Sequence, residues 1–142
     1  MTLSRELLLI HLRIGGLAMA SLVIVNLFVP SRFRWREEMS RLSLVNRQIF
    51  QVHTLFLVLI LALFSALVLT CANELLEPTR LSRAILIGLT VFWGLRMAVQ
   101  WGFYSSALWR GHRFNTVVHY VFSVLWIYLT SVFAVALWMN GH

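Results

Sequence analysis

Three side chains that could hold a cofactor fall within otherwise apolar stretches of the chain: His53, Arg96 and His119. Imidazole nitrogens are common axial ligands of haem iron, and a guanidinium pairs with carboxylate or carbonyl oxygens. Gln100 follows Arg96 by one helical turn. A charged side chain at the centre of a membrane costs about 2.5 kcal/mol or more, so Arg96 indicates a functional or structural need.

The elements that must position these residues are membrane helices. The chain has 142 residues, of which 60% are hydrophobic and only 12% are charged, whereas soluble domains carry about 25% charged residues. A net charge of +7 would suggest nucleic acid as the partner of a soluble protein. In a membrane protein the same charge is typical of cytoplasmic loops, so we expect no nucleic-acid partner.

Four apolar stretches are long enough to cross a bilayer, which needs about 20 residues each. Their short connectors predict antiparallel neighbours, and therefore an all-α, up-down-up-down four-helix bundle that forms a single domain over residues 1–142. The first stretch is expected to stop at Pro30, and residues 30–45 could include a short interfacial helix. The predicted spans are Glu6–Val29, Asn46–Cys71, Leu81–Tyr104 and Arg113–Met139.

The loop arginines predict the orientation of these spans. Seven arginines lie at one side and three at the other, and positively charged loops stay in the cytoplasm. Both termini should then face the periplasm or the exterior. The seven are Arg32, Arg34, Arg36, Arg41, Arg47, Arg110 and Arg113, and the three are Arg5, Arg80 and Arg83.

Helix rise predicts that the polar residues share one depth. His53, Arg96 and His119 lie six to eight residues from the expected cytoplasmic ends of their spans, which is roughly 10 Å at 1.5 Å per residue. Polar residues in the third and fourth spans recur at helical spacing and should face protein, because lipid cannot form hydrogen bonds. These stripes contain Trp93, Arg96, Gln100 and Tyr104, and His112, Thr116, His119, Ser123, Trp126 and Thr130.

The first span carries two further features. Gly16 and Ala20 form a small-xxx-small pair suited to close helix packing. Arg13 should either extend to the lipid headgroups or pair with Glu74 or Glu77.

Catalytic and metal sites are not indicated. The chain has no Asp, every Glu lies in or beside a loop, and Cys71 is the only cysteine. Ser123 and His119 are one turn apart but lack an orienting acid. No third ligand converges with His53 and His119. We therefore assign no catalytic residue and no metal ligand, and an enzymatic role is not favoured.

Two short motifs resemble a loose group of small bacterial inner-membrane proteins. They are R-Q-I-F at residues 47–50 and W-x-x-R-x-x-x-Q at residues 93–100. The resemblance implies four spans and a bacterial inner-membrane location, and it implies no activity. That group often has an acid shortly after the Gln, where this chain has Ser105 and Ser106.

Three interpretations of the polar residues remain open. They can hold the helices together in a non-catalytic subunit or anchor, whose partners are the lipid bilayer and other membrane-protein chains. They can bind haem b or a quinone in a redox subunit, with His53, His119, Arg96 and Gln100 as the binding residues. They can also line a small carrier or channel with a polar pocket around Arg96.

Overall fold

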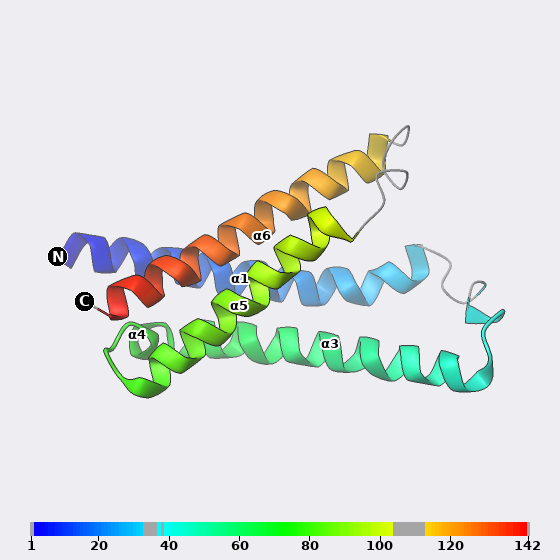
Figure 1. Cartoon of the computed structure of the whole chain (residues 1–142), viewed down its shortest axis with the longest axis horizontal. Coiled ribbons are helices and arrows are strands. Elements are labelled where there is room, and N and C mark those ends of the chain that lie inside the picture. The colour runs from blue at the N-terminus through cyan, green and yellow to red at the C-terminus, as the bar shows by residue number, and fades with distance from the viewer. Residues whose placement is uncertain (1, 33–36, 38, 104–112, 142) are drawn as a thin grey trace. The chain divides into compact units, whose positions relative to one another are not determined.

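A computed structural model describes residues 2–32, 37, 39–103 and 113–141 of the chain (Figure 1). Within these ranges the long elements are all α-helices and no strand is present, so the predicted all-α class is confirmed. The predicted interfacial helix between residues 30 and 45 falls largely outside the described residues. The helices are α1 (Thr2–Arg32), α3 (Leu44–Thr70), α4 (Ala72–Leu75), α5 (Arg80–Gly102) and α6 (Arg113–Asn140).

Four of the described helices are long and apolar enough to cross a membrane, and the protein is a multi-pass membrane protein. The spans within them differ from the predicted ones by no more than two residues at either end. They are Ser4–Phe28, Leu44–Thr70, Arg80–Gly102 and Arg113–Asn140.

The apolar span of the first helix ends at Phe28, before Pro30 as predicted, whereas the helix itself continues to Arg32. A proline lacks the backbone N–H that would bond the carbonyl four residues earlier, here that of Asn26. Pro30 lies in the last turn of α1, so it removes one backbone bond close to the helix end. The Asn26 side chain donates to the Leu22 carbonyl at 2.8 Å.

The described residues form two compact units. The first unit contains residues 1–12 and 72–142, and the second contains residues 13–71. The first therefore combines the start of α1 with α4, α5 and α6, whereas the second combines the rest of α1 with α3.

In the second unit, α1 and α3 approach closely at Gly16. The Ser65 hydroxyl donates to the Gly16 carbonyl at 2.9 Å, and both residues are buried. A Cβ atom at position 16 would lie 2.7 Å from side-chain carbons of Leu69. The close packing predicted for Gly16 thus occurs against α3, and it depends on the missing side chain.

In the first unit, α5 and α6 lie side by side and run antiparallel (Figure 1). Gln100 near the end of α5 contacts His119 near the start of α6, while Ser82 at the start of α5 contacts Asn140 at the end of α6. The most deeply buried residues of this hairpin recur every three or four positions, as expected for helices that present one face to protein. They are Leu86, Leu89, Trp93, Leu129, Phe133 and Ala136.

A pair of glycine substitutions tests the contact between α1 and α3. Gly16→Leu should lower the free energy of unfolding by about 1–3 kcal/mol, because the new side chain overlaps Leu69. Gly88→Leu is the control, since no described atom lies within 4 Å of a Cβ placed there. Denaturation by SDS in mixed micelles measures both variants. Equal stability of the two would contradict the close approach.

Candidate functional site

The amide of Gln100 is the centre of a buried polar cluster between α5 and α6. Its Oε1 accepts from Arg96 Nη1 at 3.3 Å and from Trp126 Nε1 at 3.4 Å, and its Nε2 lies 2.8 Å from His119 Nδ1. Gln100 and His119 are each only 7% exposed. We call Arg96, Gln100, His119 and Trp126 the Gln100 cluster. The structure thus brings together three of the four residues predicted to bind a cofactor.

The hydrogen bonds of this cluster set the tautomer of His119. Arginine and the tryptophan indole are donors only, so the Gln100 atom between Arg96 and Trp126 must be the amide oxygen. The amide nitrogen therefore donates to His119 Nδ1, which must be unprotonated. A neutral His119 then carries its hydrogen on Nε2. A haem ligand needs a free lone pair on the coordinating nitrogen, so this arrangement disfavours His119 as an axial ligand.

Arg96 also rests on an aromatic stack. Its guanidinium carbon lies 4.8 Å from the centre of the Trp126 ring. A cation over an indole gains about 0.5–2 kcal/mol, more where water is excluded. Trp126 in turn stacks on Trp93, with ring centres 5.1 Å apart, and on Phe122 at 5.4 Å. The charge that seemed anomalous in the sequence is therefore stabilised by an amide oxygen and an aromatic face.

One buried polar atom beside this stack has no partner. Trp93 is 1% exposed, and its Nε1 finds no hydrogen-bond acceptor among the described residues. A buried donor left unsatisfied costs about 1–3 kcal/mol. The indole is nevertheless retained in the stack, where its ring contacts both Trp126 and Phe92.

The possible nucleophile–base pair of Ser123 and His119 is not formed. The Ser123 hydroxyl donates to the backbone carbonyl of His119 at 2.8 Å. That bond holds the serine against its own helix and does not involve the imidazole. Ser123 is 2% exposed and acts here as a satisfied buried hydroxyl.

His53 belongs to the second unit, and its Nδ1 donates a hydrogen bond, whereas Nδ1 of His119 accepts one. Nδ1 of His53 lies 2.8 Å from the carbonyl oxygen of Ile49 on the same helix. A carbonyl can only accept, so Nδ1 carries the hydrogen and the lone pair of a neutral His53 is on Nε2. The side chain is exposed. A shared haem between His53 and His119 remains a sequence-based prediction, which the tautomer of His119 does not favour.

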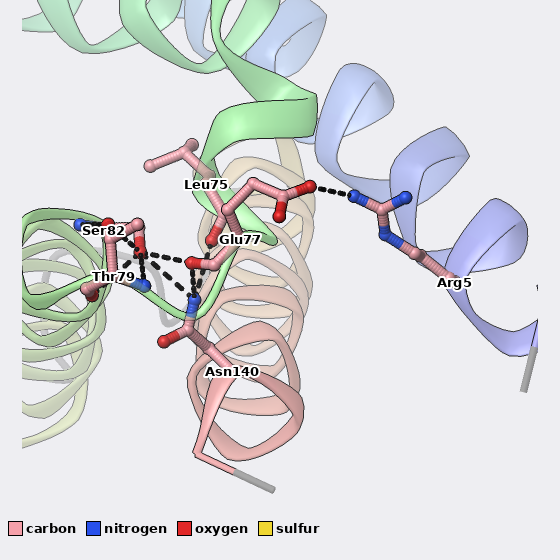
Figure 2. Close-up of polar contacts among 6 residues, drawn as sticks. All are labelled: Arg5, Leu75, Glu77, Thr79, Ser82 and Asn140. Atoms are coloured by element: carbon pink, nitrogen blue, oxygen red, sulfur yellow. Dashed lines mark hydrogen bonds and ion pairs between the residues drawn. The ribbon is translucent and has the colours of Figure 1, made fainter.

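A second polar cluster joins three segments of the first unit (Figure 2). The Asn140 amide nitrogen donates to the carbonyls of Leu75 and Glu77 and to the Ser82 hydroxyl. Thr79 caps α5, because its hydroxyl accepts from the Ser82 backbone N–H at 3.1 Å while its own N–H donates to the Ser82 hydroxyl. We call this group, together with Arg5, the Asn140 cluster.

Arg5 adds an ion pair to the Asn140 cluster. Its Nη2 lies 2.6 Å from Glu77 Oε1 (Figure 2). The sequence had suggested Arg13 as a possible partner of Glu77, whereas Arg5 takes that place and the side chain of Arg13 is exposed. The Thr79–Ser82 spacing after Pro78 is a helix-start signal that the sequence analysis missed, and Asn140 carried no local signal.

Another contact ties the start of α1 to the middle of α6. His11 Nδ1 lies 3.0 Å from the Tyr128 hydroxyl, and the two rings are tilted with centres 6.0 Å apart. Both residues are half-buried. Side chains along the whole length of α6, at His119, Trp126, Tyr128 and Asn140, therefore form hydrogen bonds to other segments of the first unit.

No protein-family model, curated protein or solved structure matches this chain. Among the described residues, no group of three or more His, Cys, Asp or Glu side chains is placed to hold a metal ion.

Removing the Gln100 amide tests whether it holds the hairpin together. Gln100→Leu leaves Arg96, Trp126 and His119 without this shared partner, and we expect a loss of about 1–3 kcal/mol in unfolding free energy. Gln51→Leu is the matched control, because Gln51 is exposed on α3. Thermal unfolding in detergent compares the two. A Gln100→Leu variant as stable as Gln51→Leu would rule out a structural role for the amide.

Substitutions at Asn140 and at Arg5 test the Asn140 cluster. Asn140→Asp replaces the donor with a carboxylate that faces two carbonyls, so unfolding free energy should fall by about 1–3 kcal/mol. Arg5→Ala should cost less than about 1 kcal/mol, because the side chains of its ion pair are 46% and 55% exposed. Protease cutting near residues 76–79 should rise only in the Asp variant. The reverse order of the two effects would contradict this assignment.

Proposed function

We propose that this protein is a non-catalytic subunit or anchor of a membrane complex in the bacterial inner membrane. One observation supports this most directly: the polar side chains of the Gln100 cluster bond one another across α5 and α6, and Ser123 beside them bonds its own helix. Gln100 links Arg96, His119 and Trp126, and Ser123 bonds its own backbone. Residues in this state stabilise helix contacts and do not present an activated nucleophile or base.

The exposed polar residues of α3 support partner chains. Gln51 and His53 are exposed within a helix that can cross a membrane, and they are two positions apart. Residues two positions apart in a helix point to different faces. Hydrocarbon cannot satisfy an amide or an imidazole, so at each position a neighbouring protein is a better environment than lipid.

The proposed orientation follows from the loop charges. Seven loop arginines at one side favour a cytoplasmic location for that side, with both termini outside the cytoplasm. The Asn140 cluster, which joins Arg5 near the start of the chain to α6 near its end, would then lie at the outer surface of the membrane.

Purification from native membranes tests the subunit proposal. A tagged chain, extracted in mild detergent after brief cross-linking, should bring down a reproducible set of membrane chains in fixed ratio. Gln51→Leu should weaken that association while the isolated chain keeps its stability, because Gln51 is exposed on the chain itself. An unrelated four-span protein with the same tag is the control. A wild-type chain that migrates alone, with no cross-linked product, would refute the proposal.

A further inference from the structure

We propose that the Gln100 amide couples the protonation of His119 to the position of Arg96, so that the Gln100 cluster is a pH-sensitive switch. The proposal goes beyond a role as a non-catalytic subunit and does not depend on it. It rests on the directions of three hydrogen bonds, on their lengths and on the burial of the residues that form them.

The first step concerns the cluster while His119 is neutral. The Gln100 oxygen accepts from Arg96 and Trp126, and the Gln100 nitrogen donates to His119 Nδ1 at 2.8 Å. Gln100 is 7% exposed, so its neighbours in the protein must satisfy the amide. One orientation of the amide serves all three neighbours, and this orientation requires that His119 Nδ1 carries no hydrogen.

The second step concerns the effect of a proton on His119. Histidine is the side chain whose charge most readily changes between about pH 5 and pH 8, and an imidazolium donates from both ring nitrogens. A protonated Nδ1 would face the NH2 group of Gln100, which is also a donor. Turning the amide over satisfies Nδ1, but it points the NH2 group at Arg96 and Trp126, which can only donate. Neither orientation serves all three neighbours, so protonation must separate at least one of them from Gln100.

The third step concerns the contact that is lost. The bond from a protonated His119 to the amide oxygen would be charge-assisted, and its 2.8 Å length suits such a bond. Arg96 and Trp126 lie farther from Gln100, at 3.3 and 3.4 Å. Trp126 is 5% exposed and stacks on Trp93, so it loses its acceptor but stays in place. Arg96 is only half-buried and has a long, flexible side chain, so Arg96 is the residue that moves.

The fourth step concerns the charges around His119. From α5 the Arg96 guanidinium faces the imidazole across the shared amide, and from α6 the Tyr120 ring lies 5.7 Å from it. A protonated His119 would compete with a second cation for one oxygen, and like charges repel more strongly where water is excluded. Once Arg96 separates from Gln100, it also leaves the face of Trp126, where its guanidinium carbon lies 4.8 Å from the ring centre. The proton on His119 thus changes the surroundings of a buried indole.

The indole N–H signals in NMR spectra test the proposal. The full chain is prepared in detergent micelles with isotopically labelled tryptophan and histidine, and it is titrated from about pH 8 to pH 5. The Trp126 signal, assigned with Trp126→Phe, should shift with the same midpoint as the His119 ring nitrogens. The physical reason is that the Trp126 indole loses both the amide oxygen and the cation in one step.

Two variants separate the amide switch from a direct effect of pH. In His119→Asn an amide oxygen can accept from Gln100 but takes up no proton, so the Trp126 signal should stay constant during the titration. In Gln100→Glu the carboxylate can accept from Arg96, from Trp126 and from a protonated Nδ1 together. Protonation then displaces neither neighbour, and the Trp126 signal should again stay constant.

A wild-type Trp126 signal that stays constant as the pH falls, or that shifts equally in His119→Asn, would overturn the proposal. A full shift in folded Gln100→Glu would overturn it as well, because the amide would then not be needed. Circular dichroism at each pH confirms that the variants are folded. Each of these results leaves co-purification with other membrane chains, and so the subunit proposal, unaffected.

Discussion

The need to satisfy polar atoms where water is absent governs this structure. In hydrocarbon each unsatisfied backbone or side-chain group costs several kcal/mol, so polar residues within spans must find partners in protein. The Gln100 amide meets this need because it is both acceptor and donor. Its oxygen accepts hydrogen bonds from Arg96 and Trp126, which can only donate, and its nitrogen donates to Nδ1 of His119. A leucine or a carboxylate at this position could not serve all three, since neither has a donor.

Much of the architecture could be predicted because it depends on composition and periodicity. The four spans follow from the length of the apolar stretches, and the proximity of Arg96, Gln100 and His119 follows from helix rise and helical spacing. The roles of the two histidines could not be predicted in the same way. Depth along a helix gives no information about which ring nitrogen carries the hydrogen, and that depends on Gln100 for one ring and on Ile49 for the other.

The long-range contacts of the loops could not be predicted from the sequence either. Asn140 reaches carbonyls more than sixty positions earlier, at Leu75 and Glu77, and no local pattern marks such a pair. The ion pair of Glu77 shows the same limit, because the sequence suggested Arg13 as its partner and only the fold selects Arg5. A smaller difference between sequence and structure is that α1 continues past Pro30. The loss of one backbone hydrogen bond there did not end the helix.

The first unit combines two segments that lie far apart in the sequence, residues 1–12 and 72–142. This arrangement has a consequence for biosynthesis. Residues 13–71 of the second unit are contiguous, so α1 and α3 can pair while the ribosome is still making the rest. The carbonyls of Leu75 and Glu77 must wait for Asn140, which is translated more than sixty positions later. The loop before α5 therefore cannot form these hydrogen bonds until Asn140 has been made.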